Sequence, residues 1–167
     1  MRLSSAPKFS LANGDMEAGT ETPDSWSRSW VGRGDLKVSR DALIKHGGAA
    51  SLHVQSVGGD SMGQAAQTLD GARGSSFTLS GWMKTAGTVK VNVYVQSFDG
   101  GWHPVADQGF QQAAYAQDAS DWTHFEKRIT LPADVAHFGV GVLLEGTGDA
   151  WLDDVQMSDI QLPPVEP

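Results

Sequence analysis

The sequence predicts an all-β fold, an antiparallel β-sandwich, from three observations. Apolar and polar residues alternate in several short segments, most clearly in VKVNVYVQ at 89–96, where the four valines share one face. Turn-forming residues separate these segments, in keeping with the 20 Gly and 7 Pro of the chain. Almost no segment has the period of an amphipathic helix. Many short strands at short spacing are typical of a sandwich.

Alternation also defines a strand in the middle of the chain and one near its end. At 76–85, Phe77 and Leu79 face the side opposite to Trp82 and Lys84. Shorter strands are expected elsewhere, which gives the full set 8–11, 26–31, 35–39, 50–56, 64–69, 76–85, 89–96, 122–131, 138–144 and 150–158. Turn signals lie between them, at Asn13-Gly14, Gly47-Gly48, Gly58-Gly59-Asp60, Asp70-Gly71, Asp99-Gly100-Gly101 and 146–149. The stretch 108–119 is expected to form a short helix or a long loop.

Length and charge narrow the classes of function. A chain of 167 residues suits one domain, expected at 1–160 and followed by a Pro-rich linker stub at 161–167. The formal net charge of -8 disfavours nucleic acid and anionic membranes as partners and suits a neutral ligand. The absence of Cys excludes disulfides, thiol catalysis and Cys-ligated zinc. No apolar run is long enough to span a bilayer, and the opening MRLSSAPKFS shows no signal peptide.

Several motifs in a fixed order resemble a known family. They are NGDMEAG at 13–19, GGAASLHV at 47–54, TLSGWMKT at 78–85, DWT at 121–123 and WLDDV at 151–155. This order resembles the jelly-roll carbohydrate-binding modules of the family 4, 9 and 22 group, within the galactose-binding-domain-like folds. The resemblance extends from about Phe9 to Ile160. It departs from the usual pattern at Met16, where an aromatic residue is usual, and at Ser25, where Gly is more usual.

The resemblance implies a jelly-roll β-sandwich that binds a polysaccharide or oligosaccharide without performing chemistry. It also implies a structural Ca²⁺ ion and a secreted, extracellular or periplasmic location. Such modules are usually fused to a glycoside hydrolase or lyase, which they hold near its substrate. We expect a β-linked plant or algal polysaccharide as ligand, a monomer, and no binding to nucleic acid or membranes.

One candidate sugar site is the polar face of the strand at 89–96. Asn92, Tyr94 and Gln96 lie opposite the valines, and amides and a phenol suit recognition of sugar hydroxyls. If 76–85 and 89–96 pair as a hairpin, Trp82 joins this face as an apolar platform. Glu145, His137 and Gln67 are further candidates that could complete this surface. The alternative is a polar sheet face that only keeps the protein soluble.

A second candidate sugar site lies in the turn FDGGWH at 98–103. Trp102 in an exposed turn suggests a ligand platform, with Trp26 or Tyr115 as a companion ring. The alternative is that Trp102 folds back over the edge of the sandwich.

The candidate metal site joins the two ends of the chain. Glu17 follows the first expected strand, and Asp153 and Asp154 lie in the last. Asp153 has the parity of the core-facing Val155, and a carboxylate at the core edge is costly unless it is paired or bound to metal. The resemblance also implies an ion here, and because calcium prefers carboxylate and carbonyl oxygens, a carbonyl near Gly47 or Gly48 is expected as a further ligand. Without the resemblance, these residues are ordinary turn or surface carboxylates.

Two other classes of function stay open. The segment GDSMG at 59–63 fits the G-x-S-x-G pattern around Ser61, but the strand–elbow–helix context that this motif needs is absent from the sequence pattern. A polysaccharide lyase or hydrolase domain is conceivable, with Tyr94, Lys84, Lys90 and His137 near an acidic sugar. A structural spacer or protein-interaction sandwich is the remaining alternative.

Overall fold

The computed structural model describes residues 10–71 and 73–163, and the structural statements below concern these residues. Strands form one antiparallel sheet in the order β1-β2-β6-β3-β4, and β5 also pairs with β3. Their bounds are β1 (Ser27–Asp41), β2 (Ser51–Asp70), β3 (Ser76–Phe98), β4 (Phe110–Gln117), β5 (Ser120–Thr130) and β6 (His137–Gln161). Within the described ranges no helix has the length and apolar character needed to cross a bilayer. The all-β prediction is confirmed.

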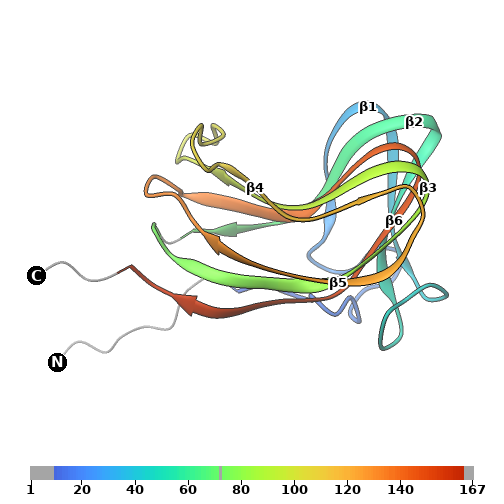
Figure 1. Ribbon diagram of the computed structural model, residues 1–167, viewed down its shortest axis with the longest axis horizontal. Coiled ribbons are helices and arrows are strands. Elements are labelled where there is room, and N and C mark those ends of the chain that lie inside the picture. Colours follow the sequence, from blue (N-terminus) through green and yellow to red (C-terminus); the bar gives the residue numbers. More distant parts are fainter. Residues whose placement is uncertain (1–9, 72, 164–167) are drawn as a thin grey trace, which may run out of the picture.

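The sheet folds over on itself because β1, β2, β3 and β6 each run through both layers of the sandwich. The front layer contains 27–33, 61–70, 88–98, 110–117 and 137–146. The back layer contains 35–41, 51–57, 76–86, 120–130 and 149–161. Figure 1 shows the two layers one above the other, with β4 in one and β5 in the other. Most of the short strands predicted from the sequence are therefore halves of longer strands.

Glycines allow the long strands to bend from one layer to the other. Gly87 in β3 has φ 94° and Gly146 in β6 has φ 121°, a region that side chains disfavour. The two backbones also approach closely here, since a Cβ on Gly87 would lie 2.5 Å from the carbonyl oxygen of Thr147. The residues read as turn signals at 146–149 thus mark a bend inside β6.

The core fills the space between the two layers. It contains the valines of 89–96, residues of like parity in β6, and apolar residues of the back layer such as Phe77, Leu79 and Leu52. Met16 and Trp26, from the segment before β1, are also buried in it. The alternation seen in the sequence therefore separates core from surface correctly.

Four expectations about individual segments are wrong, or fall wholly or partly outside the described part. The segments 76–85 and 89–96 do not pair as a hairpin, because both belong to β3 and continue through Gly87. The stretch expected as a helix or loop at 108–119 contains β4. Residues 10 and 11 of the strand expected at 8–11 are not in a strand, and residues 8 and 9 lie outside the described range. Of the linker expected at 161–167, residue 161 still belongs to β6, and 164–167 are not described.

Candidate functional site

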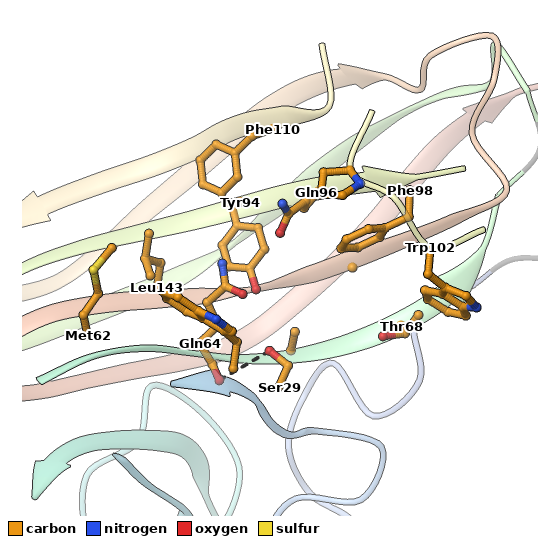
Figure 2. A pocket seen from close by; sticks show the side chains of 14 residues that line it. Ser29, Met62, Gln64, Thr68, Tyr94, Gln96, Phe98, Trp102, Phe110 and Leu143 are labelled. Carbon is orange, nitrogen blue, oxygen red and sulfur yellow. Dashed lines mark hydrogen bonds between the residues drawn. The ribbon is translucent and has the colours of Figure 1, made fainter. Parts of the chain in front are cut away.

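A groove with a volume of about 580 Å³ lies on the outer face of the front layer. Its residues come from β1, β2, β3, β4, β6 and the loop between β3 and β4, as Figure 2 shows. The lining consists of Ser29, Trp30, Met62, Gln64, Ala66, Thr68, Tyr94, Gln96, Phe98, Trp102, Pro104, Phe110, Gly139 and Leu143. None of these side chains carries a charge. The groove therefore suits a neutral ligand with both apolar and hydroxyl-bearing surfaces.

Tyr94 forms the floor of the groove. Its side chain projects from the outer face of β3 as the alternation predicts, but only 2% of the residue is exposed. Its ring stacks on that of Phe110, with ring centroids 5.2 Å apart and planes inclined by 14°. Burial raises the pKa of Tyr94 above its usual value, so the phenol stays protonated. Tyr94 supports the site from below and is not the exposed reader of hydroxyls expected from the sequence.

Trp102 stands at one end of the groove, on the loop that follows β3. Its residue surface is 55% exposed, and its indole lines the groove beside Phe98. The backbone turns tightly here, because the Trp102 N–H donates to the Asp99 carbonyl at 3.0 Å and Trp102 has φ 64°. The Asp99 carboxylate accepts the N–H groups of Gly101 and His103, and the bond from His103 is the main reason that the pKa of Asp99 is lowered. The turn thus sets the backbone from which the exposed indole reaches the groove.

Two glutamines supply polar groups to the groove. Gln64 of β2 and Gln96 of β3 both line it, on either side of the Tyr94 ring (Figure 2). Within the described ranges, neither side-chain amide has a hydrogen-bond partner in the protein. An amide offers both a donor and an acceptor. These two side chains are therefore available to read ligand hydroxyls.

Asn92 and Glu145 share the outer face of the front layer but lie outside the groove lining. Asn92 accepts a hydrogen bond from the side chain of Gln112 on β4. Glu145 lies toward the bend, 3.7 Å from the Arg33 guanidinium, which also pairs with Asp60. Both side chains are occupied by protein partners.

The structure separates three predicted aromatic residues from the groove. Trp82 lies in the back layer, stacked on His46 with ring centroids 4.0 Å apart, because β3 bends between Trp82 and Tyr94. Trp26 is buried in the core, and its indole N–H donates to the Asn13 carbonyl at 3.0 Å. Tyr115 lines a different depression between β4 and β5. The expectation that Trp82 and Tyr94 form one patch, and that Trp26 is a surface ring, is wrong.

The carboxylates proposed as metal ligands gather around the loop at 46–50. Asp153 is completely buried and accepts the backbone N–H groups of His46 and Gly47 at 2.9 and 3.1 Å. Glu17 accepts the N–H groups of Ala49 and Ala50. A Cβ on Gly48 would overlap the Glu17 carboxylate, so only Gly fits between the loop and this side chain. Glu17 and Gly48 therefore lie close together, and the ligation of an ion by Glu17 and a carbonyl near Gly48 stays a prediction.

The same carboxylates do not form a complete cation site in this structure. Asp154 faces outward to His46, with Oδ2 2.7 Å from Nδ1. In the described ranges, no three acidic or His side chains converge on one point as a metal-binding group. Burial raises the pKa of Asp153 to about 6. The carboxylate oxygens suit Ca²⁺ by their chemistry, but here they accept N–H groups, and a calcium site needs further carbonyl or carboxylate oxygens directed at the same point. The calcium site stays a prediction.

Ser61 has the surroundings of a structural residue. It is completely buried where β2 bends, and its hydroxyl lies between the Gly59 carbonyl and the N–H of Asp35, each at 3.3 Å. The segment 59–63 lies within β2 and no helix follows it. The strand–elbow–helix geometry of a serine nucleophile is therefore missing here.

Sequence reasoning missed a part of the groove for which a signal was present. Met62, Gln64, Ala66 and Thr68 alternate along β2 and all line the groove. Their shared parity in the sequence predicts a common face. Phe110 could not be found in this way, because 108–119 was not expected to be a strand.

Comparison with known proteins places these features in context. A family model described as "Carbohydrate binding domain" matches residues 10–147. The CBM22-1 xylan-binding domain from Paenibacillus barcinonensis Xyn10C shares the fold with a TM-score of 0.63 and 16% identity, over 90% of this chain and 94% of that chain. TmCBM61 in complex with β-1,4-galactotriose shares it with a TM-score of 0.60 and 16% identity, over 90% of this chain and 98% of that chain.

A longer protein also contains this fold. The enzymatically active domain of bacteriophage CBA120 tailspike protein 4 aligns with 89% of this chain at 16% identity and a TM-score of 0.68. The chain spans only 21% of that tailspike chain. No match was found among curated protein sequences. These structural matches establish the fold, and the family model covers most of the chain.

Proposed function

Because the chain belongs to the carbohydrate-binding domain family, we propose that the groove of the front layer binds a neutral polysaccharide and performs no chemistry on it. The observation that carries this proposal is the exposed indole of Trp102 at one end of an uncharged groove with two free amides. Aromatic rings pack against the C–H faces of sugars, and amides exchange hydrogen bonds with water for hydrogen bonds with hydroxyls. The acidic surface outside the groove disfavours polyanionic glycans.

The proposed biological use is to hold an attached enzyme at its substrate. Solved structures of similar fold include the xylan-binding domain from Xyn10C and a module bound to β-1,4-galactotriose. A secreted or periplasmic glycoside hydrolase or lyase is therefore the proposed fusion partner. Tethering raises the effective concentration of the enzyme at the polysaccharide without a need for tight binding.

A structural Ca²⁺ ion is part of the proposal. Support comes from the carboxylates of Glu17 and Asp153, which both contact the loop at 46–50 and join the two ends of the domain. Their hard oxygens suit this ion, which would add stability to the fold. The groove contains neither residue.

Affinity electrophoresis tests the proposed function. The protein is run in native gels that contain soluble xylan, β-1,4-galactan or polygalacturonate, and its migration is compared with that in a gel without polysaccharide. We expect retardation by one or more neutral polysaccharides and none by polygalacturonate. Neither reducing ends nor unsaturated products are expected after prolonged incubation. Absence of retardation by every neutral polysaccharide, or release of products, would contradict the proposal.

A further inference from the structure

We propose that His137 is a positioning residue of the groove, which holds the Trp102 indole with one face open to the ligand, and that Asp70 orients His137. The role in ligand binding rests on the proposed function. The placement of Trp102 does not, because it can be measured without ligand.

The stacking of His137 on Trp102 is close and parallel. Their ring centroids are 3.8 Å apart and the planes are inclined by 1°. At this distance nothing fits between the rings, so a ligand cannot stack on the part of the indole face that His137 covers. Trp102 is nevertheless more than half exposed and lines the groove, whereas His137 is not part of the lining. The face of the indole that remains open is thus the face available to a sugar ring.

His137 is itself held by the ends of three strands. It is the first residue of β6, where it pairs with Asp70 at the end of β2 and with Phe98 at the end of β3. Its Nδ1 lies 2.8 Å from Oδ1 of Asp70. A ring that is anchored at its backbone and at one nitrogen has a fixed plane. Because the strands hold the imidazole in place, its stacking on Trp102 restricts the motion of this loop side chain.

The loop alone does not fix the indole. The turn from Asp99 to Trp102 sets the backbone of the tryptophan, and the Phe98 ring touches it only at an angle of 48° with centroids 6.0 Å apart. The side-chain torsions of Trp102 depend on what its ring packs against. A platform that is already immobile loses less conformational entropy on binding than a mobile one does. His137 supplies this immobility.

Two further His–Trp stacks in the protein have no such role. His46 stacks on Trp82 and His53 stacks on Trp151, and both pairs lie on the back layer away from the groove. His124 also packs beside Trp82, with ring centroids 5.1 Å apart. These pairs provide internal controls, because removing their histidines changes a Trp environment without touching Trp102.

The test uses protein labelled with 5-fluorotryptophan, in which the ¹⁹F resonance of Trp102 is assigned by its absence from Trp102→Phe. Without ligand, His137→Ala is expected to shift the Trp102 resonance, because the ring current of the imidazole is lost. His137→Phe restores a stacked ring but not the contact with Asp70, so it is expected to return the chemical shift of Trp102 only part of the way to that of the parent. Asp70→Ala removes an exposed partner and is expected to shift the same resonance without lowering stability. In His124→Ala the Trp102 resonance should not move.

The second measurement is the affinity for soluble xylan or β-1,4-galactan, whichever retards the parent. We expect His137→Ala to weaken binding by about threefold to tenfold, in line with the loss of one aromatic pair, and His137→Phe to recover part of this loss. An unchanged Trp102 resonance in His137→Ala, or a loss of affinity that His137→Phe does not reduce at all, would overturn the inference. If the parent binds neither polysaccharide, the proposed function fails, and the fluorine resonances alone decide whether His137 positions Trp102.

Discussion

The hydroxyl oxygen of Tyr94 lies 2.9 Å from the position that a Cβ atom on Gly141 would occupy. The two residues are directly opposite each other on β3 and β6, so the tyrosine ring leans over the glycine of the neighbouring strand. The same Cβ would lie 2.4 Å from the Ala65 carbonyl oxygen of β2. Because Gly141 has no side chain, the Tyr94 ring can lie over it and form the floor of the groove.

Gly141→Ala is expected to destabilise the fold by about 1–3 kcal/mol, because the added methyl group must displace both the ring and a backbone carbonyl. Thermal unfolding measures this, and Gly100→Ala is the matched control, since a Cβ there meets nothing within 4 Å. Equal melting temperatures of the two variants would contradict the close packing of Tyr94 on Gly141.

Trp102→Ala is expected to fold like the parent and to lose at least about 2 kcal/mol of binding free energy, roughly thirtyfold in affinity, because the exposed platform is removed. Trp82→Ala serves as control, since Trp82 lies in the back layer against His46 and is expected to leave the affinity unchanged. Retardation in polysaccharide gels and melting curves are measured for both. If Trp82→Ala alone weakened binding, the ligand would lie on the other layer.

Gln64→Ala and Gln96→Ala are each expected to weaken binding by about 1 kcal/mol, or roughly fivefold, the net value of one hydrogen bond. Both amides face the groove and lack protein partners in the described part of the chain, so stability should change little. Asn92→Ala is the control, because its amide is engaged by Gln112 outside the groove lining. The prediction fails if isothermal titration finds the parent affinity in both glutamine variants.

The face of each residue could be predicted from the sequence, whereas the connection between faces could not. Alternation placed Tyr94 and Gln96 on the strand face opposite to Val93 and Val95, and the structure agrees, although it buries Tyr94 beneath the groove. The same parity placed Trp82 on an outer face, which is also true, but on the other layer. A single strand that bends at Gly87 and a hairpin that turns there have the same local pattern. Only the pairing of β3 with β6 along its full length distinguishes them.

Long-range packing also decided which aromatic residues are exposed. Trp26 and Trp102 both follow turn-forming residues, yet Trp26 is in the core and Trp102 is more than half exposed. The difference arises from partners distant in sequence, because Asn13 accepts the indole N–H of Trp26, whereas His137 stacks on Trp102 from behind. Neither contact has a local signal. The acidic residues around Gly48 were predicted mainly from the resemblance of the motifs, and periodicity added only that Asp153 shares the core-facing side of Val155.

Gly87→Ala is expected to destabilise the fold by about 3 kcal/mol, which is roughly 6–12 °C in melting temperature for a chain of this size. Two costs add, because φ is 94° and a Cβ would lie 2.5 Å from the Thr147 carbonyl oxygen. In Gly58→Ala only the backbone strain applies, since φ is 76° and nothing lies within 4 Å of a Cβ, so a loss of about 1 kcal/mol is expected. Similar losses in both variants would show that the close approach of β3 and β6 at the bend is unimportant.

Removal of calcium is expected to lower the melting temperature by about 5–10 °C, which corresponds to a free energy of binding near 2.7 kcal/mol at a hundredfold excess of ion over its dissociation constant. Glu17 and Asp153 both contact the loop at 46–50, so an ion between them would tie the segment before β1 to the end of the domain.

The melting temperature is measured with chelator and again after Ca²⁺ is restored. Glu17→Gln should abolish the difference, whereas Asp107→Asn, at an exposed position by the groove-side loop, should preserve it. Polysaccharide binding should be unchanged once calcium is restored, because the groove contains none of these residues. A melting curve that is the same with chelator and with added calcium, together with no metal in elemental analysis, would rule the ion out and leave the N–H groups as the permanent partners of both carboxylates.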